Sequence, residues 1–156
     1  MEGKPVSESY SELSELALPN DANGLNTLLG GKIMHLVDIA GAIAAARHSR
    51  SFCVTAAFDH MDFRKPVPIG NLLVLRAAVN RVFRTSMEVG VKVFAEDLRA
   101  AEIHHVASAY LTFVAVGAGR ETVPVPPVIP ESDEEKRRYE EAAERRVYRL
   151  SRRARR

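Results

Sequence analysis

The spacing of hydrophobic residues divides the chain into one long helix and a run of strands. The stretch from Gly30 to about Arg47 or His48 is apolar and rich in alanine, which favours a helix. Beyond it, alternation of apolar and polar positions predicts strands. These strands cover residues 52–63, 71–83, 86–96 and 102–116, with a weaker one within 6–18. Because the connections between successive strands are short and polar, we expect antiparallel neighbours and an α+β fold in which the sheet curls around the helix.

A proline-dense segment separates this core from a polar second helix. The sequence VPVPPVIP contains too much proline for either regular structure. The segment after it opens with Ser132 and Glu135, the spacing of a capping box, and it changes from acidic to basic along its length, as the helix dipole favours. We therefore expect one α+β domain over residues 5–118, a spacer over 119–130 and a basic C-terminal helix over 131–156.

One carboxylate, Asp38, interrupts the long apolar helix near its middle. At about 100° per residue, one side of the helix gathers bulky residues that we expect to pack on the sheet: Ile33, Leu36, Ile39 and Ile43. Asp38 projects roughly opposite, on a face with the small residues Gly41, Ala42 and Ala45. Since small side chains allow close approach, we expect a second subunit, a substrate or both to cover this face. A carboxylate at such a place is commonly functional; the alternative is a solvated side chain on an alanine-rich helix.

A pair of glycines at the start of the same helix gives a second chemical signal. Gly30 and Gly31 leave room for a ligand beside backbone N–H groups that have no intrahelical partner. Such donors stabilise a carbonyl oxygen as it becomes an oxyanion, by about 3–4 kcal/mol per donor. Because Asp38 follows about two turns later, the arrangement suggests acyl transfer. A tight turn that requires glycine is the alternative.

Composition and charge restrict the class of protein. The 156 residues are 46% hydrophobic and 27% charged, as in one globular domain, and a net charge of +2 is too small to imply a nucleic-acid or membrane partner. Seven arginines follow from Arg145 onward. For these we favour a solvated or interface helix end that pairs with its own acidic residues over binding to RNA, an anionic surface or CoA phosphates.

The chain has neither a secretory signal nor an apolar run near the roughly 20 residues of a membrane span, and its lone cysteine, Cys53, suits a reducing compartment. We expect a cytoplasmic protein. The five histidines lack zinc-motif spacing, and the sequence contains no P-loop and no G-x-S-x-G elbow. We therefore expect no metal and no cofactor.

Three stretches of the chain resemble the hotdog-fold acyl-CoA thioesterases, particularly the brain-type cytosolic acyl-CoA hydrolases and bacterial short-to-medium-chain relatives. They read DANGLNTLLGGKIMHLVDIAGAIAAARHS, VTAAFDHMDFRKPVPIG and RTSMEV. The resemblance covers residues 5–118 and implies a single hotdog domain whose dimers form one continuous sheet and assemble as trimers of dimers. It also implies hydrolysis of acyl-CoA at the dimer interface, with coenzyme A present only as part of the substrate and product.

The resemblance also assigns roles to individual residues. It places the catalytic carboxylate at Asp38, and it places at Asn23 an asparagine that faces this carboxylate from the neighbouring subunit. The N–H of Gly31 would polarise the thioester carbonyl, while Asp38 either activates a water or attacks directly to give a mixed anhydride. Because CoA carries phosphates, a basic rim is expected. The candidate substrate-binding residues are Gly30, Arg64, Lys65, Arg84 and Ser86.

Two other functions stay open on the sequence alone. A hotdog hydratase or dehydratase usually needs a catalytic histidine with its aspartate, and no histidine occupies the matching position of the helix. A non-catalytic acyl-CoA sensor could dispense with the helix carboxylate, whereas this chain keeps Asp38, Asn23 and both glycines.

Overall fold

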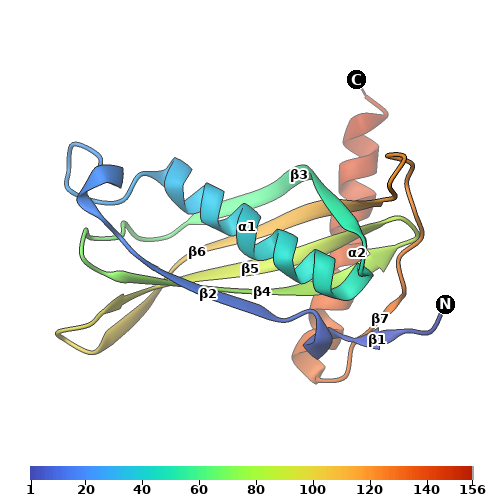
Figure 1. Cartoon of the computed structure of the whole chain (residues 1–156), viewed down its shortest axis with the longest axis horizontal. Coiled ribbons are helices and arrows are strands. Elements are labelled where there is room, and N and C mark those ends of the chain that lie inside the picture. The colour runs from blue at the N-terminus through green and yellow to red at the C-terminus, as the bar shows by residue number, and fades with distance from the viewer. Residues whose placement is uncertain (156) are drawn as a thin grey trace.

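The computed structural model describes residues 1–155. A five-stranded antiparallel sheet forms the middle layer, with one helix on each of its faces (Figure 1). In the order in which they lie side by side, its strands are β2 (Ser11–Leu16), β4 (Leu72–Phe83), β5 (Ser86–Asp97), β6 (Glu102–Val116) and β3 (Phe52–Phe63). The four long strands agree with the predicted ranges to within one residue, and β2 lies inside the predicted 6–18.

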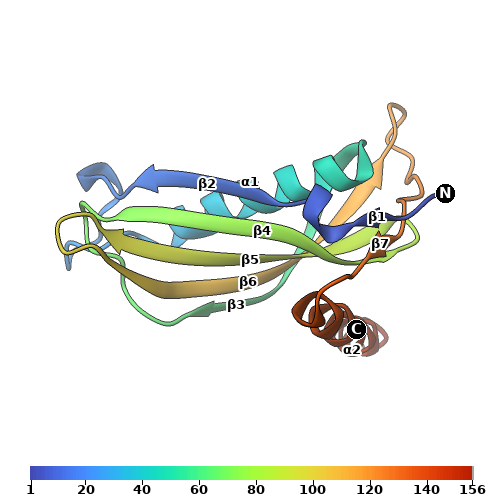
Figure 2. The same ribbon diagram turned by 90° about the horizontal axis from the view of Figure 1, so that it is seen from below.

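Helix α1 (Gly30–Ser49) runs along the inner face of the sheet, which curves around it (Figure 2). The helix ends at Arg50, whose φ of +53° is left-handed and whose N–H bonds the carbonyl of Ala46. The predicted α+β architecture, a long helix wrapped by a curved antiparallel sheet, is therefore confirmed. Two short 3-10 turns, η1 (Val6–Glu8) and η2 (Pro19–Asp21), flank β2.

The side of α1 that faces the sheet agrees with the prediction only in part, because Ile33 and Leu36 are buried in the core as expected but the other two predicted residues are not. Small residues are buried there, among them Ala40, Gly41 and Ala45, whereas Ile39 and Ile43 point outward and are each 38% exposed. A Cβ on Gly41 would lie 3.0 Å from the ring of Phe113 on β6. The small side chains thus allow α1 to approach its own sheet closely, so the prediction that a second subunit or a substrate covers Gly41 and Ala45 is wrong.

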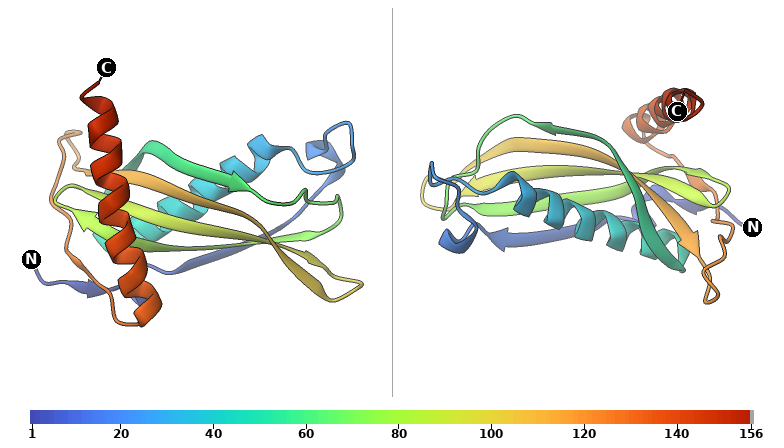
Figure 3. Two further views of the ribbon diagram at one scale, coloured as in Figure 1. Left: turned by 180° about the vertical axis from the view of Figure 1, so that it is seen from behind. Right: turned by 90° about the horizontal axis from the view of Figure 1, so that it is seen from above.

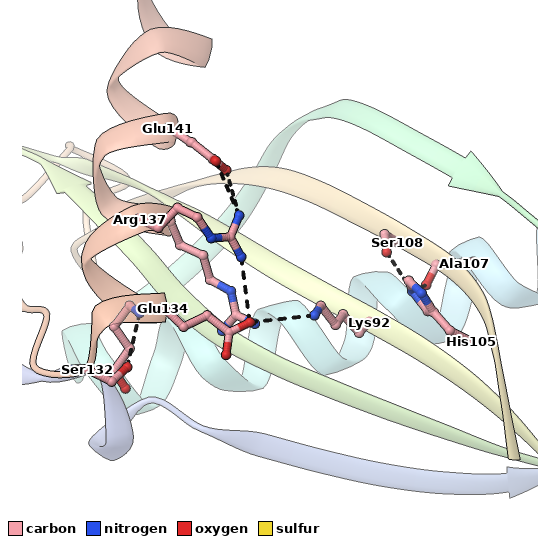
Figure 4. Close-up of polar contacts among 10 residues, drawn as sticks. Lys92, His105, Ala107, Ser108, Ser132, Glu134, Arg137 and Glu141 are labelled. Carbon is pink, nitrogen blue, oxygen red and sulfur yellow. Dashed lines mark hydrogen bonds and ion pairs between the residues drawn. The ribbon is translucent and has the colours of Figure 1, made fainter.

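Helix α2 (Asp133–Arg153) crosses the outer face of the sheet (Figure 3). The predicted capping box is present, because Ser132 Oγ accepts the N–H of Glu135 at 3.1 Å and the Glu135 carboxylate accepts the N–H of Ser132 at 3.2 Å. Near this end, Glu134 lies 3.6 Å from Arg137 and 4.0 Å from Lys92 of β5 (Figure 4).

The proline-rich segment before α2 is not devoid of regular structure. Residues Val128–Ile129 form a short strand, β7, that pairs in parallel with β1 (Lys4–Pro5). Val125 and Val128 are buried against the core. Proline blocks only its own N–H, and the non-proline residues between the prolines are free to pair, which is why the expectation of no regular structure is wrong here.

Strand β3 is one edge of the sheet, with β6 as its only neighbour among the described residues. Several of its apolar side chains are exposed, including Phe52 at 75% and Val54 at 51%. A long apolar edge is a template for pairing with another strand. The outward isoleucines of α1 and this edge together leave apolar surface that one protomer does not cover.

Candidate active site

Asp38 lies at the flank of α1, where the helix meets β3. Thr55 of β3 donates its hydroxyl hydrogen to Asp38 Oδ1 at an O···O distance of 2.6 Å. The carboxylate is half-buried, and among residues 1–155 no other side chain bonds it. One oxygen is therefore fixed by β3, while Oδ2 is available to accept a proton or to face a carbonyl carbon.

The start of α1 offers backbone donors on the same side of the helix. Leu29 precedes the first turn and gives no side-chain cap, so the N–H groups of Gly30 and Gly31 have no intrahelical acceptor. A Cβ on Gly31 would meet no heavy atom of the chain within 4 Å. Seven residues separate Gly31 from Asp38, which is about 10 Å along the axis and almost two full turns. An open N–H and a half-buried carboxylate therefore share one flank.

Asn23 belongs to the loop before α1 and does not contact Asp38 within one protomer. Its Oδ1 accepts the N–H groups of Leu25 and Thr27 at 2.9 and 3.1 Å, and its Nδ2 donates to Thr27 Oγ1 at 2.8 Å. Because an amide nitrogen has two hydrogens, one donor is left after these bonds. The Asn23 side chain is thus held in place by its own loop and can donate one further hydrogen bond to a group outside that loop.

The four polar candidates for CoA binding divide into two pairs at opposite ends of the sheet. Arg64 and Lys65 follow β3 and are exposed, and Arg64 lies 3.5 Å from Asp62. Arg84 forms the β4–β5 turn with a left-handed φ of +40°, and the Ser86 hydroxyl donates to Phe83 O at 3.4 Å. Ser86 is level with the far end of β3, roughly 30 Å from Arg64 at the usual rise per strand residue. Within one protomer, these two pairs of residues are therefore too far apart to bind the same phosphate group of CoA.

Two further polar clusters lie on the outer face of the sheet, and the sequence did not predict them. Arg145 of α2 holds the buried Glu88 of β5 with N···O distances of 2.7 and 2.9 Å. Arg149, one turn later, lies 3.3 Å from Asp59 of β3. We expected these arginines to pair with acidic residues of their own helix, and Arg145 does lie 4.0 Å from Glu141. The shorter pairs, however, join α2 to acids of the sheet.

The surface hollows of the protomer also lie on this outer face. One of about 290 Å³ and one of about 710 Å³ are lined by α2 and the sheet, and neither includes Asp38. Within residues 1–155, no cluster of three or more His, Cys, Asp or Glu side chains is arranged to hold a metal ion. In the same range, neither helix combines the length and the apolarity that crossing a membrane requires.

A helix wrapped by an antiparallel sheet, with a carboxylate on its flank and open amides at its start, defines a hotdog-type acyl-transfer protein. The chain belongs to the thioesterase superfamily, whose family model matches residues 25–102. It is similar to the Bacillus subtilis protein named uncharacterized acyl-CoA thioester hydrolase YkhA, with 43% identity over 128 residues that cover 82% of this chain and 74% of that protein.

Solved structures give the same likeness over the whole length. The crystal structure of an apo-hexameric acyl-CoA thioesterase matches with a TM-score of 0.96 and 38% identity, and the match covers 100% of both chains. The acyl-CoA hydrolase of Staphylococcus aureus, solved with butyryl-CoA, CoA and CoA disulfide, matches with a TM-score of 0.91 and 36% identity over 97% of this chain and 92% of that one. That enzyme has also been solved with an asparagine, an aspartate or a threonine replaced by alanine.

Thr55 is the residue that sequence reasoning missed. It lies in the second stretch that resembles the thioesterases, but nothing in the alternation of β3 marks it as a partner of Asp38. One feature of the sequence could have indicated Thr55. It is the only residue with a hydroxyl side chain within residues 52–63, and that strand was expected to follow directly after the helix that carries Asp38.

Proposed function

We propose that this protein hydrolyses acyl-CoA thioesters to a free carboxylic acid and CoA, and that Asp38 is the residue that acts on the thioester. The observation that carries the proposal is the half-buried carboxylate fixed by Thr55 on the same flank as the open Gly31 N–H. The names of the relatives support the reaction. The three residues replaced in the Staphylococcus aureus enzyme support the site, because they have the same order and spacing as Asn23, Asp38 and Thr55: fifteen residues, then seventeen.

In the proposed mechanism Asp38 is a general base. A carbonyl whose oxygen accepts the Gly31 N–H would lie on the same flank as the carboxylate, because Gly31 precedes Asp38 by almost two full turns. Asp38 Oδ2 takes a proton from a water, the resulting hydroxide attacks the carbonyl carbon, and the C–S bond breaks to release thiolate. Direct attack by Asp38 to give a mixed anhydride is the alternative route.

The catalytic unit of this proposal is a dimer. Asp38 lines neither of the two hollows described above, and the edge strand β3 beside it is apolar and has a neighbouring strand on one side only within the described chain. Pairing of two β3 strands would cover this edge and would bring the free Nδ2 hydrogen of Asn23 from one subunit toward Asp38 of the other. It would also allow Arg64 and Lys65 of one subunit to share a CoA molecule with Arg84 and Ser86 of the other. Further assembly to a hexamer is supported by the hexameric relative.

The test compares wild type with Asp38→Asn, using a panel of acyl-CoAs and release of free thiol as the readout. General-base catalysis contributes about 10²- to 10⁴-fold, so kcat should fall at least about a hundred-fold while light scattering shows an unchanged oligomer. Asp133→Asn, an exposed residue at the start of α2, is the matched control. Near-normal turnover by Asp38→Asn would reject the mechanism, and binding without turnover by wild type would favour the acyl-CoA sensor.

A further inference from the structure

Strand β3 is held from its outer side by α2, on the face opposite to Asp38. Arg149 Nη1 lies 3.3 Å from Asp59 Oδ2, and the two side chains are only 15% and 10% exposed. The Thr112 hydroxyl of β6 donates to the same carboxylate oxygen. Asp59 is therefore fixed from two directions, by the neighbouring strand and by the second helix.

Asp59 also occupies an irregular part of β3. The pairing with β6 shifts register twice, between Thr55 and Ala57 and between Phe58 and His60, and Asp59 is the extra residue of the second shift. In a regular strand, residues four positions apart point to the same face. Here Thr55 faces α1 and Asp59 faces α2, because bulges reorient the side chains that flank them.

We propose that Asp59 and Arg149 are positioning residues for Asp38, acting through the bulged segment of β3 and through Thr55. This inference rests on the proposed function of Asp38. Asp59 fixes the second bulge, the bulges set the direction of Thr55, and Thr55 holds Asp38 Oδ1. Among residues 1–155, the pair Asp59–Arg149 is the one ion pair that joins α2 to β3. Helix α2 therefore contributes to the geometry of a carboxylate on the other face of the sheet.

A positioning role and a purely structural role predict different measurements. If the ion pair only stabilises the fold, its removal lowers the melting temperature and leaves kcat of the folded enzyme unchanged. If it positions Thr55, its removal lowers kcat while KM stays close to wild type, because substrate contacts are intact and only the reacting geometry is lost. Small displacements of a catalytic group cost about ten-fold or more in rate.

The principal variant is Arg149→Met, which keeps the length of the side chain and removes its charge. Arg152→Met on the same helix is the matched control, because the hydrogen bond and the cation–π contact described for the Arg152 side chain are both with Tyr148 and involve no acid. We expect Arg149→Met to lower kcat about ten-fold, Arg149→Lys to recover part of this loss, and Arg152→Met to behave as wild type. Thr112→Val removes the second bond to Asp59 and should lower kcat in the same way.

The decisive measurement is the double variant Thr55→Val/Arg149→Met. If Arg149 acts through Thr55, adding Arg149→Met to Thr55→Val causes no further loss of kcat; multiplied effects would overturn the inference. If Arg149→Met does not fold, Thr112→Val replaces it in the double variant. No further loss of kcat beyond that of Thr55→Val would then support the inference, and multiplied losses would overturn it. An inactive Asp38→Asn together with unchanged kcat in Arg149→Met would overturn the positioning role alone. An active Asp38→Asn would overturn the proposed role of Asp38, and this inference with it.

Discussion

Replacing Arg145 by methionine would leave the buried carboxyl group of Glu88, between the sheet and α2, without its counter-ion. Glu88 is 1% exposed and receives two N–H groups of Arg145 and one of Asn80, at 2.7, 2.9 and 2.9 Å. At 2.7 Å and an effective dielectric constant of about 20, the attraction between the two charges is roughly 6 kcal/mol, most of which offsets the cost of removing them from water. Loss of one partner of such a pair costs about 3–5 kcal/mol, and we expect this loss of unfolding free energy for Arg145→Met.

Urea unfolding at one fixed protomer concentration measures this loss, because assembly makes apparent stability depend on concentration. Arg137→Met is the matched control: Arg137 is 56% exposed and pairs with Glu134 and Glu141 of its own helix, so the change should be below about 1 kcal/mol. The double variant Glu88→Gln/Arg145→Met should recover most of the stability, because the neutral amide introduced at this position would bury no charge and its oxygen would still accept from Asn80. If Arg145→Met is no less stable than Arg137→Met, Glu88 does not depend on its counter-ion and the reasoning is refuted.

Three further predictions concern α1. His48 is fully buried, with Nε2 2.7 Å from Pro126 O and Nδ1 unpartnered among the described residues. Burial lowers the pKa of His48 in the folded protein below 6.5. Below about pH 6.5 the unfolded chain therefore binds a proton at His48 more readily than the folded chain does, and the free energy of unfolding falls as the pH drops. Thermal melts at about pH 7.5 and pH 5.5, on either side of the ordinary histidine pKa of about 6.5 that applies to the unfolded chain, should show a smaller drop for His48→Gln; equal drops would contradict this. Gly41→Ala should cost about 1–3 kcal/mol against the Phe113 ring, whereas Gly31→Ala should preserve stability and slow thiol release.

The boundaries of the elements could be predicted because the hydrophobic period changes sharply. Residues 30–49 are apolar without alternation, and residues 86–97 alternate so regularly that Met87, Val89, Val91 and Val93 are all buried. The orientation of α1 could not be predicted by size alone. The prediction that bulky side chains pack on the sheet is confirmed for Ile33 and Leu36 and wrong for Ile39 and Ile43. Farther along the helix, Gly41 and its small neighbours take the buried positions and allow α1 to approach the sheet closely.

Only those parts of the candidate site whose residues lie close together in the sequence could be predicted. Asp38 and Gly31 lie on one helix, so their spacing alone puts them on one flank. Contacts between distant segments leave no such pattern. The partners of Arg145 and Arg149 are 57 and 90 residues away in the chain, and two bulges in β3 decide which face each of its polar residues joins. The alternation of apolar and polar residues in the sequence does not reveal where a strand contains an extra, unpaired residue.

The ion pair between Glu88 and Arg145 also bears on how the protein is made. During synthesis β5 leaves the ribosome 57 residues before the guanidinium that neutralises its carboxylate, so every strand of the sheet exists while Glu88 still has no counter-ion. The bond between Arg145 and Glu88 can therefore form only after α2 has been made. This part of the outer layer is completed later than the sheet that it covers.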